Sequence, residues 1–159
     1  IEDEIIENYE GRVINIHASR LPYGRGIGTI LISLLFPCPI GVSIHLIDKK
    51  FDNGPILDVK DVSIDDFIYS TQRYLHAKLV DESQKLLIKN WYKIKHLNFK
   101  LLPNSRYGKN IPYFNRSESE IFLEALPDKW DTKVSDILRI GVNFAIGEGF
   151  WHQFNYYDE

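Results

Sequence analysis

Three polar residues of this 159-residue chain have the types and the spacing that chemistry on a carbonyl group requires. Asn15 and His17 are alternate residues at the end of an expected strand, so their side chains leave the same face and can approach one oxygen atom. Two N–H donors aimed at that oxygen would stabilise the negative charge that develops on it during nucleophilic attack. Imidazole can also take or relay a proton near neutral pH. Asp52, about 35 residues after His17, can orient the imidazole, raise its pKa by charge and order water for proton transfer.

Each of these residues taken alone has a plainer explanation. Asn15 before a turn is ordinarily a strand-end cap, a single histidine is more often structural than catalytic, and the sequence at 52–54 is common turn chemistry. The combination of the three is what indicates a site. A second histidine, His45, lies in a later expected strand, where we expect it to be satisfied within the sheet rather than to bind a ligand.

The elements that must position these residues alternate between strand and helix. Such alternation favours an α/β fold with a largely parallel sheet. The most apolar run, 27–36, is much shorter than the roughly 20 residues of a membrane-spanning helix. In chain order, the sequence predicts a helix over 1–9, a strand over 12–16, a loop over 17–28, a helix over 28–36, a strand over 41–47, a loop over 48–55, a strand over 56–62, a long helix over 64–91 capped by Ser63, a strand over 97–102, and short helices over 117–126 and 132–144.

The stretch from Asn15 to Pro55 resembles the formyltransferases that use 10-formyltetrahydrofolate, which include glycinamide ribotide, methionyl-tRNA and amino-sugar formyltransferases. The family pattern is Asn-x-His-x-Ser-x-Leu-Pro with a following Arg-Gly, and then Asp-x-Gly beyond a buried strand. The resemblance implies that Asn15, His17 and Asp52 are catalytic, in the attack of an amine on a formyl carbon. It also implies substrate or cofactor contacts for further matching positions: Ser19, Pro22, Arg25, Gly26 and Gly54.

The chain departs from the family pattern at Ala18, Arg20 and Asn53, and none of these changes touches the Asn-His-Asp set. Arg20 adds a cation beside the expected acceptor channel, which favours a phosphorylated substrate, so we include it among the expected binding residues. No metal is implied by the resemblance, and the single cysteine, Cys38, excludes a multi-cysteine zinc site.

The resemblance implies a Rossmann-like α/β fold of formyltransferase type with a mostly parallel sheet. Residues 1–95 match the C-terminal half of that catalytic core. Residues 96–159 are expected to form a small mixed extension of short helices and an aromatic tail, which offers a surface for a homodimer. The given sequence begins at Ile1 without a methionine, so we expect it to be a piece of a longer product. We expect this piece to lack part of the folate site.

Charge and composition bear on the partners. A net charge of −3 supplies no general attraction to nucleic acid or to anionic membranes. After Leu97 acidic residues outnumber basic ones, which argues against electrostatic capture of tRNA. The first residues of the given sequence do not predict a signal peptide, and we expect a reduced cytoplasmic setting, which fits the single cysteine.

The preferred acceptor is the primary amine of a small substrate, an amino sugar or a similar amine, and a nucleotide-linked sugar is one form that it can take. The extension resembles those of amino-sugar formyltransferases, which favours this branch. Methionyl-tRNA and glycinamide ribotide are the alternative acceptors. Two other functions use the same fold: a hydrolase that deformylates the folate, and a non-catalytic binding module.

Overall fold

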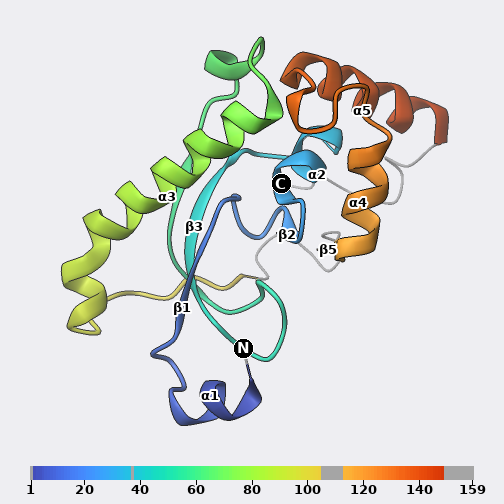
Figure 1. Cartoon of the computed structure of the whole chain (residues 1–159). Coiled ribbons are helices and arrows are strands. Elements are labelled where there is room, and N and C mark those ends of the chain that lie inside the picture. The colour runs from blue at the N-terminus through green and yellow to red at the C-terminus, as the bar shows by residue number, and fades with distance from the viewer. Residues whose placement is uncertain (1, 37, 105–112, 149–159) are drawn as a thin grey trace.

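The computed structural model describes residues 2–36, 38–104 and 113–148, which form a mixed α/β structure (Figure 1). Most expected elements are present within a few residues of their predicted bounds. In chain order the elements are α1 (Asp3–Asn8), β1 (Ile14–His17), β2 (Arg25–Gly26), α2 (Thr29–Leu35), β3 (Gly41–Leu46), β4 (Ile56–Asp61), the 3-10 turn η1 (Asp65–Phe67), α3 (Gln72–Lys95), β5 (Tyr113–Phe114), α4 (Arg116–Glu124), the 3-10 turn η2 (Lys129–Asp131) and α5 (Val134–Glu148). The aromatic tail at 149–159, part of the predicted dimer surface, lies outside the described residues.

The main sheet has three strands in the order β1-β3-β4, and both of its pairings are antiparallel. The prediction of a mostly parallel sheet is therefore not confirmed in the described part of the chain. His17 at the end of β1 lies opposite Ser43 near the start of β3, so the segment with α2 leaves β1 and returns to β3 at the same end of the two strands. The predicted strand at 97–102 is reduced to a bridge between Leu102 and Ile56, and β2 pairs with β5 in parallel.

The long helix begins later than predicted. Its N-cap is Thr71, whose hydroxyl accepts a hydrogen bond from the Tyr74 N–H at 3.2 Å. The hydroxyl of Ser63, the predicted cap, instead accepts from the Asp65 N–H in a short turn. Residues 68–72 bond through their backbone to residues 132–135, and this tertiary pairing excludes helical bonding there.

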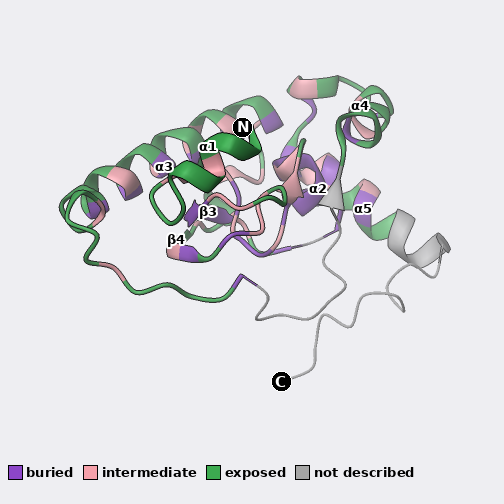
Figure 2. Ribbon diagram, turned by 90° about the horizontal axis from the view of Figure 1, so that it is seen from below, coloured by how far each residue is buried: buried purple, intermediate pink, exposed green. Residues whose placement is uncertain are grey.

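The core lies between α3, the sheet and the helices of the C-terminal segment. β3 is buried along its whole length, and α3 crosses one face of the sheet (Figure 1). Figure 2 shows that burial is concentrated in α2 and β3, whereas the outer surfaces of α1 and α3 are exposed. α5 packs on α2, and its Ile137 belongs to the same buried cluster as Leu34. None of the helices in the described ranges is long and apolar enough to cross a membrane.

Candidate functional site

Strand register brings the predicted chemical residues together on one face of the sheet. Asn15 lies opposite His45, and His17 lies opposite Ser43, so the four side chains share that face. Asp52 reaches the same place from the loop between β3 and β4. Its Oδ1 lies 3.2 Å from Asn15 Nδ2 and 3.7 Å from His17 Nδ1. The predicted Asn-His-Asp set is thus a spatial cluster.

Both N–H groups of the Asn15 amide already have acceptors. One is Asp52 Oδ1, and the other is His45 Nε2 at 3.1 Å. The Nδ1–H of His45 donates to the Leu46 carbonyl at 2.7 Å, so in the neutral ring Nε2 is the accepting nitrogen. The predicted donation from Asn15 to an oxyanion therefore requires that Asn15 give up one of these bonds.

His17 is buried, and its tautomer follows from one contact. Nε2 lies 2.9 Å from the Gly24 carbonyl oxygen, which can only accept, so Nε2 carries the proton in the neutral ring. Nδ1 is then the basic nitrogen, and it is the one that faces Asp52. Burial lowers the pKa of His17 below its ordinary value, even though the charge of Asp52 and the Gly24 carbonyl act to raise it. Neutral pH thus favours a ring whose Nδ1 can take a proton.

The Asp52 carboxylate is held in its charged form. Burial raises the pKa of Asp52, but the positive charge that His45 or His17 carries when protonated, together with the hydrogen bond from the Gly26 N–H, outweighs this and lowers it overall. His45 Nε2 lies 3.5 Å from Oδ1, and the Gly26 N–H donates to Oδ2 at 2.9 Å. The predicted site residue Gly26 therefore contacts the Asp52 carboxylate through its backbone.

Gly54 and Arg25 shape the loop around Asp52. A Cβ at Gly54 would lie 1.9 Å from the Leu46 carbonyl oxygen, so only glycine allows this approach of loop to strand. Arg25 Nη1 donates to Asn53 Oδ1 at 3.0 Å, and burial lowers the pKa of Arg25 against the charges of nearby aspartates. In the structure both residues position the loop, and their predicted substrate contacts stay predictions.

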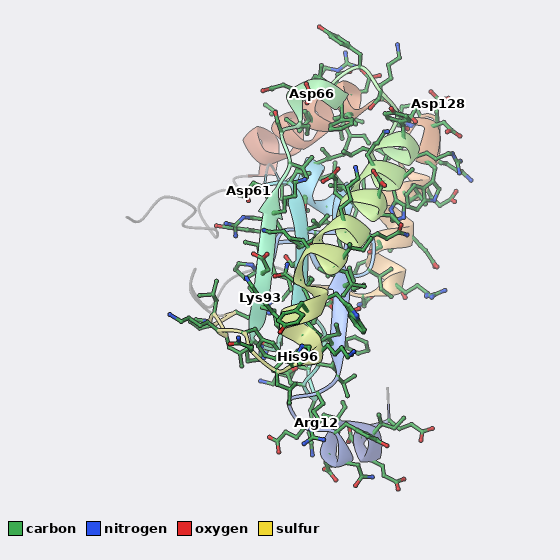
Figure 3. The ribbon with its side chains drawn as sticks, turned by 90° about the vertical axis from the view of Figure 1, so that its left-hand side faces the viewer. Arg12, Asp61, Asp66, Lys93, His96 and Asp128 are labelled. Carbon is green, nitrogen blue, oxygen red and sulfur yellow. The ribbon has the colours of Figure 1, made fainter. Side chains whose placement is uncertain are left out.

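The remaining predicted binding residues also have structural partners. The buried Ser19 hydroxyl lies 2.7 Å from the Tyr23 carbonyl oxygen, and Pro22, which follows a cis peptide bond, is buried. Arg20 Nε donates to Asp61 Oδ1 at 2.6 Å. Asp61 lies at the end of the sheet away from Arg12 (Figure 3). The predicted roles of Ser19, Pro22 and Arg20 in binding remain untested by these contacts.

A cavity of about 440 Å³ opens beside the cluster. Asn15, His45 and Asp52 line it, together with α1 and residues 47–51. This volume is in the range of small-molecule sites. Within the described ranges, no three or more His, Cys, Asp and Glu side chains gather as a metal-binding group.

His45 is the residue of this cluster that sequence reasoning undervalued. The expectation that it is satisfied within the sheet holds for Nδ1, which bonds to the backbone, but Nε2 faces Asn15 and Asp52. An antiparallel pairing of the two strands would have predicted that His45 lies opposite Asn15. Because a parallel sheet was expected, this pairing was not considered.

Comparison with known proteins identifies the family. A family model described as formyl transferase matches residues 1–90. The chain belongs to the formyl transferase family. A solved formyltransferase, PseJ from Anoxybacillus kamchatkensis, in complex with UDP-4,6-dideoxy-4-formamido-L-AltNAc and tetrahydrofolate, superposes with a TM-score of 0.79 at 30% identity, covering 89% of this chain and 72% of that one.

Two curated relatives show the breadth of this family. The dTDP-4-amino-4,6-dideoxyglucose formyltransferase of Mycobacterium tuberculosis is 31% identical over 84 residues, which are 53% of this chain and 35% of the relative. The methionyl-tRNA formyltransferase of a Sulfurihydrogenibium species is 35% identical over 135 residues, covering 77% of this chain and 42% of the relative. The chain thus spans less than half of the length of these two relatives.

Proposed function

We propose that this formyl transferase family member transfers a formyl group from 10-formyltetrahydrofolate to the primary amine of a nucleotide-linked amino sugar. The observation that carries the proposal is the neutral His17 ring, tied through Nε2 to Gly24, with its free Nδ1 3.7 Å from Asp52. The similarity to the Anoxybacillus formyltransferase, whose complex holds a formamido sugar nucleotide and tetrahydrofolate, supports the choice of substrates.

In the proposed reaction His17 acts as the base. 10-Formyltetrahydrofolate supplies the formyl carbon, to which the amine nitrogen bonds as the bond from carbon to the folate nitrogen breaks. His17 Nδ1 takes the proton that the amine loses, and returns a proton to the leaving nitrogen. The Asp52 carboxylate faces that same Nδ1, so its charge stabilises the imidazolium while the proton resides there.

Asn15 has the second role in the proposal. As negative charge develops on the formyl oxygen, one Asn15 N–H turns from its present acceptor to that oxygen. His45 Nε2 is the acceptor that Asn15 can release at lower cost, because it is uncharged in the neutral ring, whereas Asp52 is a carboxylate. Loss of one oxyanion donor typically lowers the rate by about 10²–10³-fold.

The test is a mass-spectrometric assay of formyl transfer with the complete gene product and 10-formyltetrahydrofolate. The acceptors are UDP- and dTDP-linked amino sugars, glycinamide ribotide and methionyl-tRNA. A formyl mass gain on a nucleotide-linked amino sugar is the expected result. His17→Ala and Asp52→Ala should lower kcat/KM by about 10²–10⁴-fold, whereas His96→Ala and Asp66→Ala, matched exposed positions, should not.

Other outcomes separate the alternative functions. Formate release without an amine would indicate a hydrolase, and absence of both folate binding and transfer would indicate a binding module. Wild-type turnover by His17→Ala would contradict the assignment of the base.

Methionyl-tRNA is the second candidate acceptor. The Sulfurihydrogenibium relative matches over 77% of this chain, so that similarity extends beyond the 90 residues of the family model. Transfer to methionyl-tRNA and to none of the sugar nucleotides would favour this branch.

A further inference from the structure

The loop that carries Asp52 is held by a residue from the segment after α3. Asn104 is only 4% exposed, and its Nδ2 donates to the carbonyl oxygens of Asp52 and Gly54, each at 2.9 Å. An amide nitrogen has two hydrogens, and here each meets one carbonyl. A reversed amide would place Oδ1 against two acceptors, so these contacts fix the orientation of the side chain.

The backbone of Asn104 joins a second set of contacts to the same loop. Its carbonyl oxygen accepts from Arg25 Nη2 at 2.6 Å, and Arg25 Nη1 donates to Asn53 Oδ1. Gly26, which follows Arg25 in the chain, donates its backbone N–H to the Asp52 carboxylate. Residues 52–54 are thereby held through both backbone and side chains by two segments that are distant in sequence.

Asp52 needs such support because of its backbone conformation. Its φ of +48° lies in the left-handed region, which aspartate adopts more readily than most residues but less readily than glycine. Asn104 bonds to the Asp52 carbonyl itself, and therefore restrains the peptide that sets the direction of the carboxylate. The segment with Asn104 is in turn anchored two residues earlier, where Leu102 and Ile56 exchange two backbone hydrogen bonds of 2.8 Å.

We propose that Asn104 is a positioning residue for the formyl transfer described above, and that it acts by holding the Asp52 carboxylate against His17 Nδ1. The inference rests on the proposed function, because it assigns Asn104 a role through Asp52. It also gives the segment after α3 a part in the site, where the sequence predicts only an extension.

The kinetic test is a double-mutant cycle in the complete gene product. Asn104→Ala should lower kcat by about 10–100-fold, since a small misplacement of a catalytic group has effects of that size. The KM for the amine should stay within about twofold, because Asn104 is placed to contact the loop and not the substrate. In an Asp52→Asn background, Asn104→Ala should lower kcat by less than a further factor of about two, because the effects of residues that act as a unit are not additive.

Asn98→Ala is the matched control. Asn98 is an exposed asparagine of the same connecting segment and should leave kcat unchanged. Multiplicative losses for Asn104→Ala and Asp52→Asn would overturn the proposal. If Asn104→Ala does not fold, Asn104→Ser, which keeps one donor, serves in the same cycle with the same expected non-additivity.

Hydrogen exchange separates this inference from the proposed function. Amides of residues 48–56 should exchange faster in Asn104→Ala, or in Asn104→Ser, than in wild type and Asn98→Ala. Unchanged exchange would overturn the role of Asn104 whatever the activity. If instead Asp52→Asn keeps wild-type transfer, the assigned role of Asp52 fails, and with it the route by which Asn104 acts. If the wild-type protein transfers no formyl group, the proposed function fails, and the exchange data still decide whether Asn104 holds the loop.

Discussion

His17 and Asp52 each affect the pKa of the other. Burial of the imidazole lowers the pKa of His17, and the negative charge of Asp52 raises it in part. His45, whose ring centroid is 6.1 Å from that of His17, adds a charge that lowers the pKa of His17 when it is protonated. The proposed base is therefore neutral in the resting site, and its proton affinity depends on the charge of the carboxylate beside it.

A pH profile of the Asp52→Asn variant tests this dependence. The substitution removes the charge that raises the pKa of His17, so that pKa falls further. Since the proposed base must be neutral, the acid limb of kcat/KM should move to lower pH, while its maximum falls. Asp66→Asn, at an exposed position, should leave the limb in place. A limb that moved to higher pH would show that another group governs it.

At the scale of elements, the site depends on how closely the loop after β3 approaches that strand. Gly54 is the point of contact, because a side chain there would overlap the Leu46 carbonyl. Leu46 also donates its N–H to the Pro55 carbonyl, so the loop returns along the strand that it has just left. This return places Asp52 against the face that carries His45.

Gly54→Ala should therefore be strongly destabilising. We expect it to lower the free energy of unfolding by about 3 kcal/mol or more, because an inserted methyl in a close backbone contact forces the strand or the loop to move. Gly11→Ala is the control: Gly11 has a positive φ, which strains any side chain, but a Cβ there meets nothing within 4 Å. It should cost about 1 kcal/mol in urea denaturation. Equal losses at both positions would contradict the close approach.

The elements differ in how well the sequence predicted them. α2 is a largely apolar run between Gly28 and Pro37, and β3 alternates apolar with polar residues after Gly41, so the existence and bounds of both were predictable from local pattern. The start of α3 was not, because the backbone of residues 68–72 bonds to residues 132–135 instead of forming the first helical turns. The direction of β3 relative to β1 was missed for a similar reason, since pairing is a non-local property.

For the site, the sequence predicted which residues lie together but not which hydrogen bonds they make. Types and spacing identified Asn15, His17 and Asp52 as members of one cluster, because alternation along a strand fixes which side chains share a face. Hydrogen-bond partners were beyond the sequence, and they decide that Nδ1 is the free nitrogen of His17. Asn104 could not be inferred, because its contacts join segments about 50 residues apart.

At the scale of the whole molecule, the hydrophobic core extends across the predicted boundary between 1–95 and 96–159. Val134 and Ile137 of α5 are fully buried in the same cluster as Leu34 of α2 and Ile44 of β3. Gly141 allows this packing, because a Cβ there would lie 2.3 Å from the Leu35 carbonyl oxygen. The segment after α3 thus shares its core with β1 and β3, the strands that carry Asn15, His17 and His45.

A shared core predicts one cooperative unfolding transition. Leu34→Ala and Ile137→Ala lie on opposite sides of the predicted boundary and are both fully buried, so each should lower the free energy of unfolding by about 2–5 kcal/mol. Circular dichroism and tryptophan fluorescence should report the same shifted midpoint for each variant. Ile88→Ala, on the exposed face of α3, should change stability by no more than about 0.5 kcal/mol. If Ile137→Ala instead shifted a separate unfolding transition and left the transition sensitive to Leu34 unchanged, residues 96–159 would fold as an independent unit. The hydrogen bonds from Asn104 to the Asp52 loop would then join two separately folding parts.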